Sequence, residues 1–324
     1  CTGCDLCVVV CPAVSKEKEN FKSINMRKKI EHDVVENVNW DHFVSLPYYD
    51  RTALQITNVK GSQFLEPLFE FSGACSGCGE TPYIKMITQL YGDSIMIANA
   101  TGCSSIYGGN LPTTPYKTNE FGRGPAWANS LFEDNAEFGL GLKLGLTKKQ
   151  EIAVDLLKSL ESVVGSEIVE AILNNPEDTE ALKNEKFAQI ETLNKILAKV
   201  SDNPDAKKLS QLTEYLRKKA VWIFGGDGWA YDIGYGGVDH VLSTGEDINI
   251  LVMDTEVYSN TGGQASKSTP LGASAKFTIG GKKTGKKSLA LQAISYGNVY
   301  VAQIAMGAKD LQSLKAIEEA AAYP

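Results

Sequence analysis

Residues 221–229 read Val-Trp-Ile-Phe-Gly-Gly-Asp-Gly-Trp, and residues 254–264 read Asp-Thr-Glu-Val-Tyr-Ser-Asn-Thr-Gly-Gly-Gln. The apolar runs 221–224 and 248–253 lead into them, and such runs are typical of buried strands. A glycine-bounded aspartate after a strand can reach a cation, while N–H groups at a helix N-terminus can accept a diphosphate. Alone, Gly-Asp-Gly is more often a plain turn. However, Thr255 follows the next strand, 28 residues after Asp227, and the two strand ends together predict a binding site.

The residue types at these strand ends suit Mg²⁺, which takes about six oxygen ligands at roughly 2.1 Å. Asp227, the Thr255 hydroxyl and a backbone carbonyl near Val257 could supply three of them. Two phosphate oxygens and a water could supply the others. We therefore expect a Mg²⁺ ion that holds a diphosphate group at this edge.

The sequence on both sides alternates between strand and helix patterns. Expected strands cover 94–98, 221–224, 248–253 and 299–304, and expected helices begin near 82, 233, 288 and 311. Strands that alternate with helices imply an α/β fold with a mostly parallel sheet, whose ligand site lies at the carboxyl ends of the strands.

Residues 147–219 differ because they are rich in Lys, Glu and Leu at helical spacing. Thr147 and Gln150 match a capping box, which predicts a helix start there. Pro176 and Pro204 divide the stretch into successive helices. We expect a helical insertion that packs against the sheet, and not a coiled-coil partner helix, because the periodic runs are short.

The order of these patterns suggests three parts. Residues 1–12 are the end of a ferredoxin-like domain, 13–70 are a connector, and 71–324 are the sheet domain with the helical insertion 147–219. The chain begins inside a cysteine cluster without Met, so we expect an internal piece of a longer polypeptide.

Four cysteines at the start, Cys1, Cys4, Cys7 and Cys11, form the C-x2-C-x2-C-x3-C-P run of bacterial ferredoxins. In this pattern the first three thiolates hold one 4Fe-4S cluster, and the fourth holds another. A zinc or disulfide knot is the alternative, but zinc ligands usually come as two separated C-x2-C pairs. Iron–sulfur binding is therefore the favoured interpretation.

The other three cysteines are Cys75, Cys78 and Cys103, from two adjacent loops of the α/β pattern. Three thiolates could hold zinc, or could simply be buried thiols, since C-x2-C is a common pattern. A 4Fe-4S cluster needs a fourth thiolate from another segment. The spacing alone leaves these alternatives open.

Composition excludes several classes of protein. With 32 Lys and Arg against 39 Asp and Glu, the net charge of −7 argues against a nucleic-acid binder. No apolar run is long enough to cross a membrane, and we expect a soluble, cytoplasmic protein.

His32, His42 and His240 lack partners for a hydrolase triad and are expected on the surface or in packing. The four lysines of 282–287 are expected in a solvated loop; a contact to CoA or an acidic carrier is the alternative.

Four longer runs carry a family resemblance: EFSGACSGCGETP at 70–82, ANATGCSS at 98–105, GRGPAWANSLFEDNAEF at 122–138 and DTEVYSNTGGQ at 254–264. With the ferredoxin-type cysteines, they resemble the C-terminal portion of single-chain pyruvate:ferredoxin (flavodoxin) oxidoreductases over essentially the whole chain.

The resemblance implies an enzyme that uses thiamine diphosphate, Mg²⁺ and three 4Fe-4S clusters. Asp227, Thr255 and the Val257 carbonyl would bind Mg²⁺, and Asn260 would sit beside the reacting carbon. The implied cofactor-binding residues are Gly226, Asp227, Gly228 and Trp229 at the diphosphate, with Glu80, Cys103, Thr255 and Asn260. Cys75, Cys78 and Cys103 would be cluster ligands.

The implied reaction converts pyruvate and CoA to acetyl-CoA and CO₂, with electrons passed to ferredoxin or flavodoxin. The resemblance also implies a homodimer. Three alternatives stay open: a fusion that reduces NADP, a relative with another 2-oxoacid as substrate, and an electron-transfer ferredoxin without catalysis. The ferredoxin alternative leaves the 226–264 pattern without a use.

Overall fold

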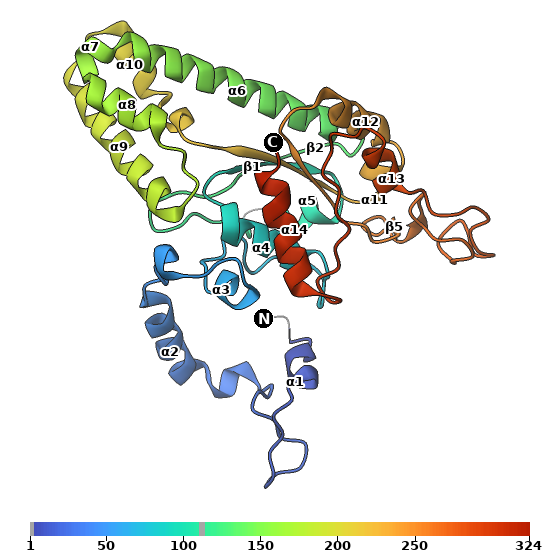
Figure 1. Cartoon of the computed structure of the whole chain (residues 1–324). Helices are drawn as coiled ribbons and strands as arrows, with labels where there is room; N and C mark the ends of the chain where they lie inside the picture. Colours follow the sequence, from blue (N-terminus) through green and yellow to red (C-terminus); the bar gives the residue numbers. More distant parts are fainter. Residues whose placement is uncertain (1–2, 110–113) are drawn as a thin grey trace.

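A four-stranded parallel sheet lies at the centre of the described part of the protein. The structure is a computed structural model that describes residues 3–109 and 114–324. The strands are β1 (Ile95–Ala100), β2 (Ala126–Ser130), β3 (Ala220–Gly225) and β4 (Asn249–Val252). They pair in the order β2-β1-β3-β4, and all three pairings are parallel. The expected α/β fold with a mostly parallel sheet is confirmed (Figure 1).

The strand order places a reversal point between β1 and β3. From β1 the chain moves outward to β2, then returns to the other side of β1 to form β3 and β4. In parallel sheets the crevice for a ligand opens at the carboxyl ends of strands beside such a reversal. Cys103 follows β1, Asp227 follows β3 and Thr255 follows β4, so three of the expected site residues come to this edge.

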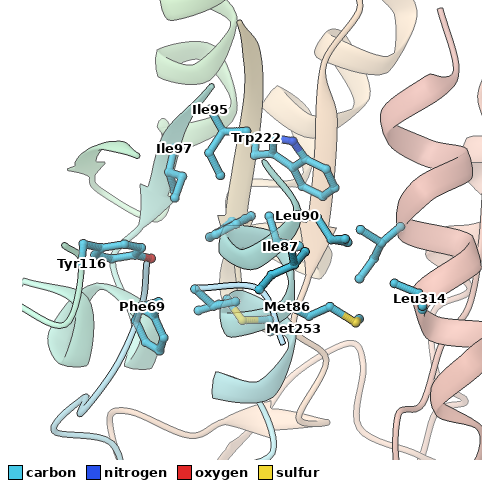
Figure 2. Packing of buried hydrophobic residues seen from close by; sticks show 14 of the residues in the cluster. Phe69, Met86, Ile87, Leu90, Ile95, Ile97, Tyr116, Trp222, Met253 and Leu314 are labelled. Carbon is cyan, nitrogen blue, oxygen red and sulfur yellow. The ribbon is translucent and has the colours of Figure 1, made fainter. Parts of the chain in front are cut away.

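Side chains alternate between the two faces of the sheet, as the two-residue period of a strand requires. Ile95 and Ile97 of β1 and Trp222 of β3 belong to one core, with α4 (Thr81–Tyr91) and α14 (Asp310–Ala322) (Figure 2). Ala98, Ala100 and Ile223 face the other core, which includes residues of α6 (Asn135–Ser159), α11 (Asp227–Tyr231) and α12 (Tyr235–Thr244). The sheet is therefore covered by helices on both faces.

Helix α6 approaches the sheet closely at Gly139. A Cβ atom at this position would lie 2.5 Å from side-chain atoms of Ile223, so only glycine fits. Buried Asn99 fixes the same region, because its amide donates to Ser104 (2.7 Å) and accepts from the Trp127 indole (3.1 Å). These contacts join β1 to α5 (Cys103–Gly108) and to β2.

The far half of α6 carries a separate helical core (Figure 1). The helices there are α7 (Glu161–Val164), α8 (Ser166–Asn174), α9 (Glu180–Lys199), α10 (Pro204–Ser210) and the 3-10 helix η3 (Thr213–Leu216). The helix breaks near Pro176 and Pro204 are confirmed. The helix start at Thr147 is wrong, because α6 begins at Asn135 and runs through Thr147 without interruption.

The segment before the sheet has little buried structure at first. Its elements are α1 (Leu6–Val10), η1 (Lys29–Glu31), α2 (Asp33–Ser45), η2 (Arg51–Ala53) and α3 (Val59–Gln63). Neither α1 nor α2 contains a buried residue. Packing onto the sheet begins with Leu54 and Leu65, which contribute to the core of α4 and α14. The hydrophobic core of the sheet domain therefore includes residues that precede residue 71.

The region after β4 contains the hairpin β5 (Val257–Tyr258) and β6 (Gln264–Ala265), and helix α13 (Leu289–Ile294). The strand expected at 299–304 is wrong, since these residues have no strand pairing. They line the same cavity as β4, so the space beside β4 is open where a fifth strand would pair. Within the described residues, no helix is both long and apolar enough to cross a membrane.

Candidate functional site

A cavity of about 1280 Å³ adjoins the carboxyl ends of the strands. It brings together two groups of the expected site residues. Its wall includes Cys75, Cys78, Glu80 and Cys103 from one group, and Thr255 and Asn260 from the other, with Asp254 and Ser259 beside them. The other expected residues, Asp227, Val257, Gly226, Gly228 and Trp229, are not part of this wall. The cysteine loops and the turn after β4 therefore face one space, although 152 residues separate Cys103 from Thr255.

Asp227, directly after β3, is the buried carboxylate of the site, with only 3% of its surface exposed. Its Oδ1 accepts from the Thr255 backbone N–H at 3.1 Å, and its Oδ2 accepts a long 3.4 Å bond from the Ser266 hydroxyl. A carboxylate has about four acceptor positions, so these bonds leave room for a further ligand. Burial, assisted by the charge of Asp254, raises the pKa of Asp227 to about 7. A cation at this carboxylate would compensate the cost of ionising it.

Asp254, at the end of β4, has its acceptor positions filled. Tyr231 donates to it at 2.8 Å and the Lys286 ammonium lies 2.7 Å away. The Ser268 hydroxyl and the Glu256 N–H donate to its other oxygen. Burial alone would raise the pKa of Asp254, but these donors hold it below its ordinary value. Asp254 thus joins separate segments, while Asp227 keeps open acceptor positions.

The turn after Asp254 presents two more oxygens. The Thr255 hydroxyl lies 3.0 Å from the Val257 carbonyl oxygen and 2.6 Å from the Ser259 hydroxyl. Asp227 also accepts a hydrogen bond from the Thr255 N–H, so hydrogen bonds connect the three expected Mg²⁺ ligands, Asp227, Thr255 and Val257. A carboxylate, a hydroxyl and a carbonyl are the hard oxygen donors that Mg²⁺ prefers. The residues present therefore fit a Mg²⁺ ion.

The glycines beside Asp227 have different surroundings. A Cβ atom on Gly228 would lie 2.4 Å from the Tyr258 ring, whereas on Gly226 the nearest atom would be 3.7 Å away, the Met253 carbonyl oxygen. Gly228 is thus required by packing, whereas a Cβ atom on Gly226 would make only an ordinary van der Waals contact. Trp229 is 1% exposed and lies in the core, so only its backbone remains for a diphosphate contact.

Cys103 stands at the start of α5, where the Gly102 N–H donates to Ser105 Oγ at 2.9 Å. Burial, with the nearby charges of Glu80, Cys78 and Cys75, raises the pKa of the Cys103 thiol to about 11. Glu80 is itself partly buried and accepts from the Tyr107 hydroxyl at 2.9 Å. This environment opposes a bare thiolate, and positively charged iron would reverse that preference.

No three His, Cys, Asp or Glu side chains in the described ranges 3–109 and 114–324 are grouped so that they could hold a metal. Cys75 is exposed, and Cys78 and Cys103 are half-buried. Cys4 and Cys7 are exposed, whereas Cys1 lies outside the described residues. Cys11 is half-buried, and its pKa is lowered, chiefly by a hydrogen bond with Ala13. Iron–sulfur binding by either set stays a prediction.

The structure adds several residues that the sequence reasoning missed. Tyr231 and Ser268 bind Asp254, Ser266 binds Asp227, and Tyr107 binds Glu80. None has a diagnostic spacing from its partner. Lys286 was visible in the basic run, but nothing in that run indicated Asp254 as its partner. The three histidines are exposed, as expected.

Comparison with known proteins shows what the chain is similar to. Residues 207–324 match the thiamine pyrophosphate enzyme, C-terminal TPP binding domain. The whole chain is 59% identical to the pyruvate-flavodoxin oxidoreductase of Trichormus variabilis and 50% identical to the pyruvate:ferredoxin oxidoreductase of Moorella thermoacetica. The chain is related to the single-chain pyruvate:ferredoxin (flavodoxin) oxidoreductases along its whole length. It spans 27% and 28% of the length of these two oxidoreductases.

Two further comparisons differ in strength. The probable pyruvate-flavodoxin oxidoreductase of Escherichia coli is 52% identical over 324 residues, which are all of this chain and 27% of that protein. A solved 2-oxoglutarate:ferredoxin oxidoreductase from Magnetococcus marinus aligns with a TM-score of 0.41 and 17% identity, covering 77% of this chain and 60% of that one. The thiamine pyrophosphate match contains Asp227, Thr255 and Asn260, whereas all seven cysteines lie before it.

Proposed function

We propose that this chain is part of an enzyme that oxidises pyruvate with CoA to acetyl-CoA and CO₂ and passes the electrons to ferredoxin or flavodoxin. The observation that carries the proposal is the meeting of two groups of residues on one cavity. Cys103 follows β1 and Thr255 follows β4, and both line that cavity. In a chain related to oxidoreductases of this name, a decarboxylation site beside an electron carrier explains this juxtaposition.

In this proposal Asp227, the Thr255 hydroxyl and the Val257 carbonyl hold Mg²⁺ with the diphosphate, and Gly226, Gly228 and the Trp229 backbone line it. When bound, thiamine diphosphate supplies carbanion stabilisation and each 4Fe-4S cluster accepts one electron at a time. Asp227 would be the anionic ligand of the Mg²⁺ ion. Asn260 lines the cavity, where its amide can orient the substrate.

The cysteines have separate roles. We assign Cys75, Cys78 and Cys103 to the cluster nearest thiamine diphosphate, with Glu80 beside the cofactor. Residues 1–12 are assigned to a ferredoxin-like domain with Cys1, Cys4, Cys7 and Cys11 as ligands of two further clusters. Residues 13–70 then serve as a connector whose last part, from Leu54 onward, packs onto the sheet, and 147–219 serve as a helical insertion in a cytoplasmic homodimer.

The test is the change Asp227→Ala in the complete polypeptide, followed by calorimetric titration with thiamine diphosphate and Mg²⁺. Loss of the anionic ligand should weaken cofactor binding by at least about a hundredfold, because the diphosphate charge is then poorly neutralised. Asp155→Ala is the matched control, since Asp155 is an exposed carboxylate on α6. Equal affinities for the two variants would refute the assignment of Asp227.

A further inference from the structure

Residues 283–286 of the basic run at 282–287 are exposed, as expected of a solvated loop, but Lys282, Lys286 and Lys287 contact neighbouring groups. Lys282 donates to the carbonyl oxygens of Lys267 (3.1 Å) and Thr269 (2.6 Å). Lys287 donates to the Tyr231 carbonyl oxygen at 3.2 Å, and its ammonium lies 3.0 Å from the centre of the Tyr235 ring. These lysines hold backbone and aromatic groups of the same region, so they do not form a free anion-binding patch.

Lys286 makes the contacts that matter for the site. Its ammonium lies 2.7 Å from Asp254 Oδ2 and 3.2 Å from Glu256 Oε1. It therefore bridges two carboxylates on either side of Thr255, a proposed Mg²⁺ ligand. Lys283, three residues earlier, is exposed and makes no ion pair or hydrogen bond described for residues 3–109 and 114–324.

The backbone conformation of Glu256 is strained. Its φ is +65°, in the left-handed region, which costs a non-glycine residue about 1–2 kcal/mol. The turn is held at three points: Asp254 Oδ1 accepts from the Glu256 N–H at 3.0 Å, Thr269 donates to the Glu256 carbonyl, and Lys286 pairs with its side chain. Strained residues persist where the surroundings fix them, and they are frequent at functional sites.

The left-handed residue stands between the two oxygen ligands of the turn. Thr255 precedes Glu256 and Val257 follows it, and the reversal brings the Thr255 hydroxyl to 3.0 Å from the Val257 carbonyl oxygen. We infer that Lys286 is a positioning residue, whose ion pairs with Asp254 and Glu256 lock this turn so that both oxygens are arranged before the cation arrives. The inference rests on the proposed function, because it takes Thr255 and Val257 as cation ligands.

The first test is Lys286→Met in the complete polypeptide, with Mg²⁺ affinity measured by calorimetry at a fixed concentration of thiamine diphosphate. Loss of a residue that orients metal ligands typically weakens metal binding by about 10- to 100-fold, and we expect about tenfold here. Lys283→Met removes the same charge nearby and should leave the affinity unchanged. Lys286→Arg keeps the ion pairs and should stay close to the unmodified protein.

A second readout needs no bound group. In the cofactor-free protein, amide hydrogen exchange over residues 254–260 should become faster in Lys286→Met than in Lys283→Met, because the turn opens more often. Equal exchange in the two variants would overturn the positioning role.

Glycine at position 256 separates positioning from direct contact with the cofactor. Glycine adopts a left-handed φ without penalty, so Glu256→Gly removes the strain that Lys286 offsets. In this background Lys286→Met should weaken Mg²⁺ binding by only about twofold, since interacting residues give non-additive effects. A persistent tenfold loss would mean that Lys286 does not act by offsetting the strain at Glu256, and would overturn the inference.

The proposed function fails separately from this inference. If Asp227→Ala keeps full affinity, the cation site is wrong. If Asp227→Ala loses affinity while Lys286→Met matches Lys283→Met, the site stands and only the positioning role is refuted.

Discussion

Two regions carry the expected metal ligands, and they differ in how the protein holds them. At the sheet edge Asp227 is 3% exposed, and side chains from several segments fix the adjoining turn. In the first segment Cys4 and Cys7 are exposed, and α1 buries no residue. The sheet edge is arranged by hydrogen bonds, whereas the cysteine segment has little packing of its own.

The difference teaches that a specific sequence motif does not imply a preformed site. The C-x2-C-x2-C-x3-C-P run is the more diagnostic sequence pattern, and Gly-Asp-Gly is the less diagnostic one. Yet the aspartate of Gly-Asp-Gly is buried and hydrogen-bonded, whereas Cys4 and Cys7 of the cysteine run are exposed. Metal binding and folding are coupled where the ligands are not held in advance. Iron–sulfur clusters would organise the first segment, while Mg²⁺ would enter an arranged site.

The first segment also approaches the second cysteine group, Cys75, Cys78 and Cys103, through α1. A Cβ atom on Gly77, between Cys75 and Cys78, would come within 2.9 Å of the Leu6 side chain. Within the first segment, Lys22 donates to the Val8 and Val9 carbonyl oxygens at the end of α1, both at 2.7 Å.

Cys103→Ala in the complete polypeptide is expected to abolish electron transfer from pyruvate to an acceptor. Cys103 lines the same cavity as Thr255, a proposed Mg²⁺ ligand, so in the proposed function its cluster would be the first electron carrier. Iron analysis and electron paramagnetic resonance should show the loss of one cluster and the survival of the two ferredoxin-type clusters. A full set of clusters in this variant would contradict the assignment.

Removal of iron should loosen the two regions unequally. We expect amide exchange in residues 3–12 to rise by about a hundredfold after chelation, since metal binding would supply most of the order there. Exchange over 220–258 should change by no more than about twofold, because hydrogen bonds within the protein hold it. Equal effects in both regions would break the comparison.

The sheet and the place of its site could be predicted from the sequence, because they depend on local patterns. The apolar runs that became β1, β3 and β4 end beside Cys103, Asp227 and Asp254, and strand ends in a parallel sheet share one edge. The predicted ligands Asp227 and Thr255 are joined by a 3.1 Å hydrogen bond. Here sequence spacing and geometry agree.

The features that the sequence did not predict depend on contacts between residues that have no regular spacing along the chain. Thr147 and Gln150 match a capping box, but they also fit within the continuous helix α6. The run 299–304 is composed like a strand, but a strand needs a hydrogen-bonded neighbour and a cavity separates it from β4. Asp254 and Lys286 are 32 residues apart, so no local pattern connects them.

Two glycine changes would sharpen the description of the sheet edge. Gly228→Ala would force a Cβ atom to 2.4 Å from the Tyr258 ring, and such overpacking costs about 1–3 kcal/mol. Gly226→Ala meets no atom closer than 3.7 Å and has a φ of −99°, which alanine adopts. Its effect on stability should stay within about 0.5 kcal/mol.

Cofactor affinity gives the second readout for this pair. If the diphosphate passes Gly226, then Gly226→Ala should weaken thiamine diphosphate binding while thermal unfolding stays unchanged. Chemical denaturation and calorimetry of both variants measure the two effects. Unchanged affinity in Gly226→Ala would place the diphosphate elsewhere.

The two aspartates should have opposite effects on the stability of the cofactor-free protein. Burial raises the pKa of Asp227 from its ordinary value of 3.8 to about 7, so between these pH values the folded state binds a proton that the unfolded state has released. Stability therefore falls as pH rises through this window, and the full cost is present above pH 7. Asp227→Asn removes that cost and should raise the free energy of unfolding at pH 8 by about 1–2 kcal/mol.

Asp254 should behave in the opposite way. Its pKa is held below the ordinary value by Lys286, Ser268 and Tyr231, against the effect of burial, so its contribution is present at neutral pH and is lost in acid. Asp254→Asn should therefore lower the free energy of unfolding at pH 8, where Asp227→Asn raises it. Urea denaturation of both variants at pH 5 and pH 8 measures these signs. If both substitutions destabilise the cofactor-free protein at pH 8, then Asp227 is not the strained, open carboxylate that distinguishes the sheet edge as a cation site.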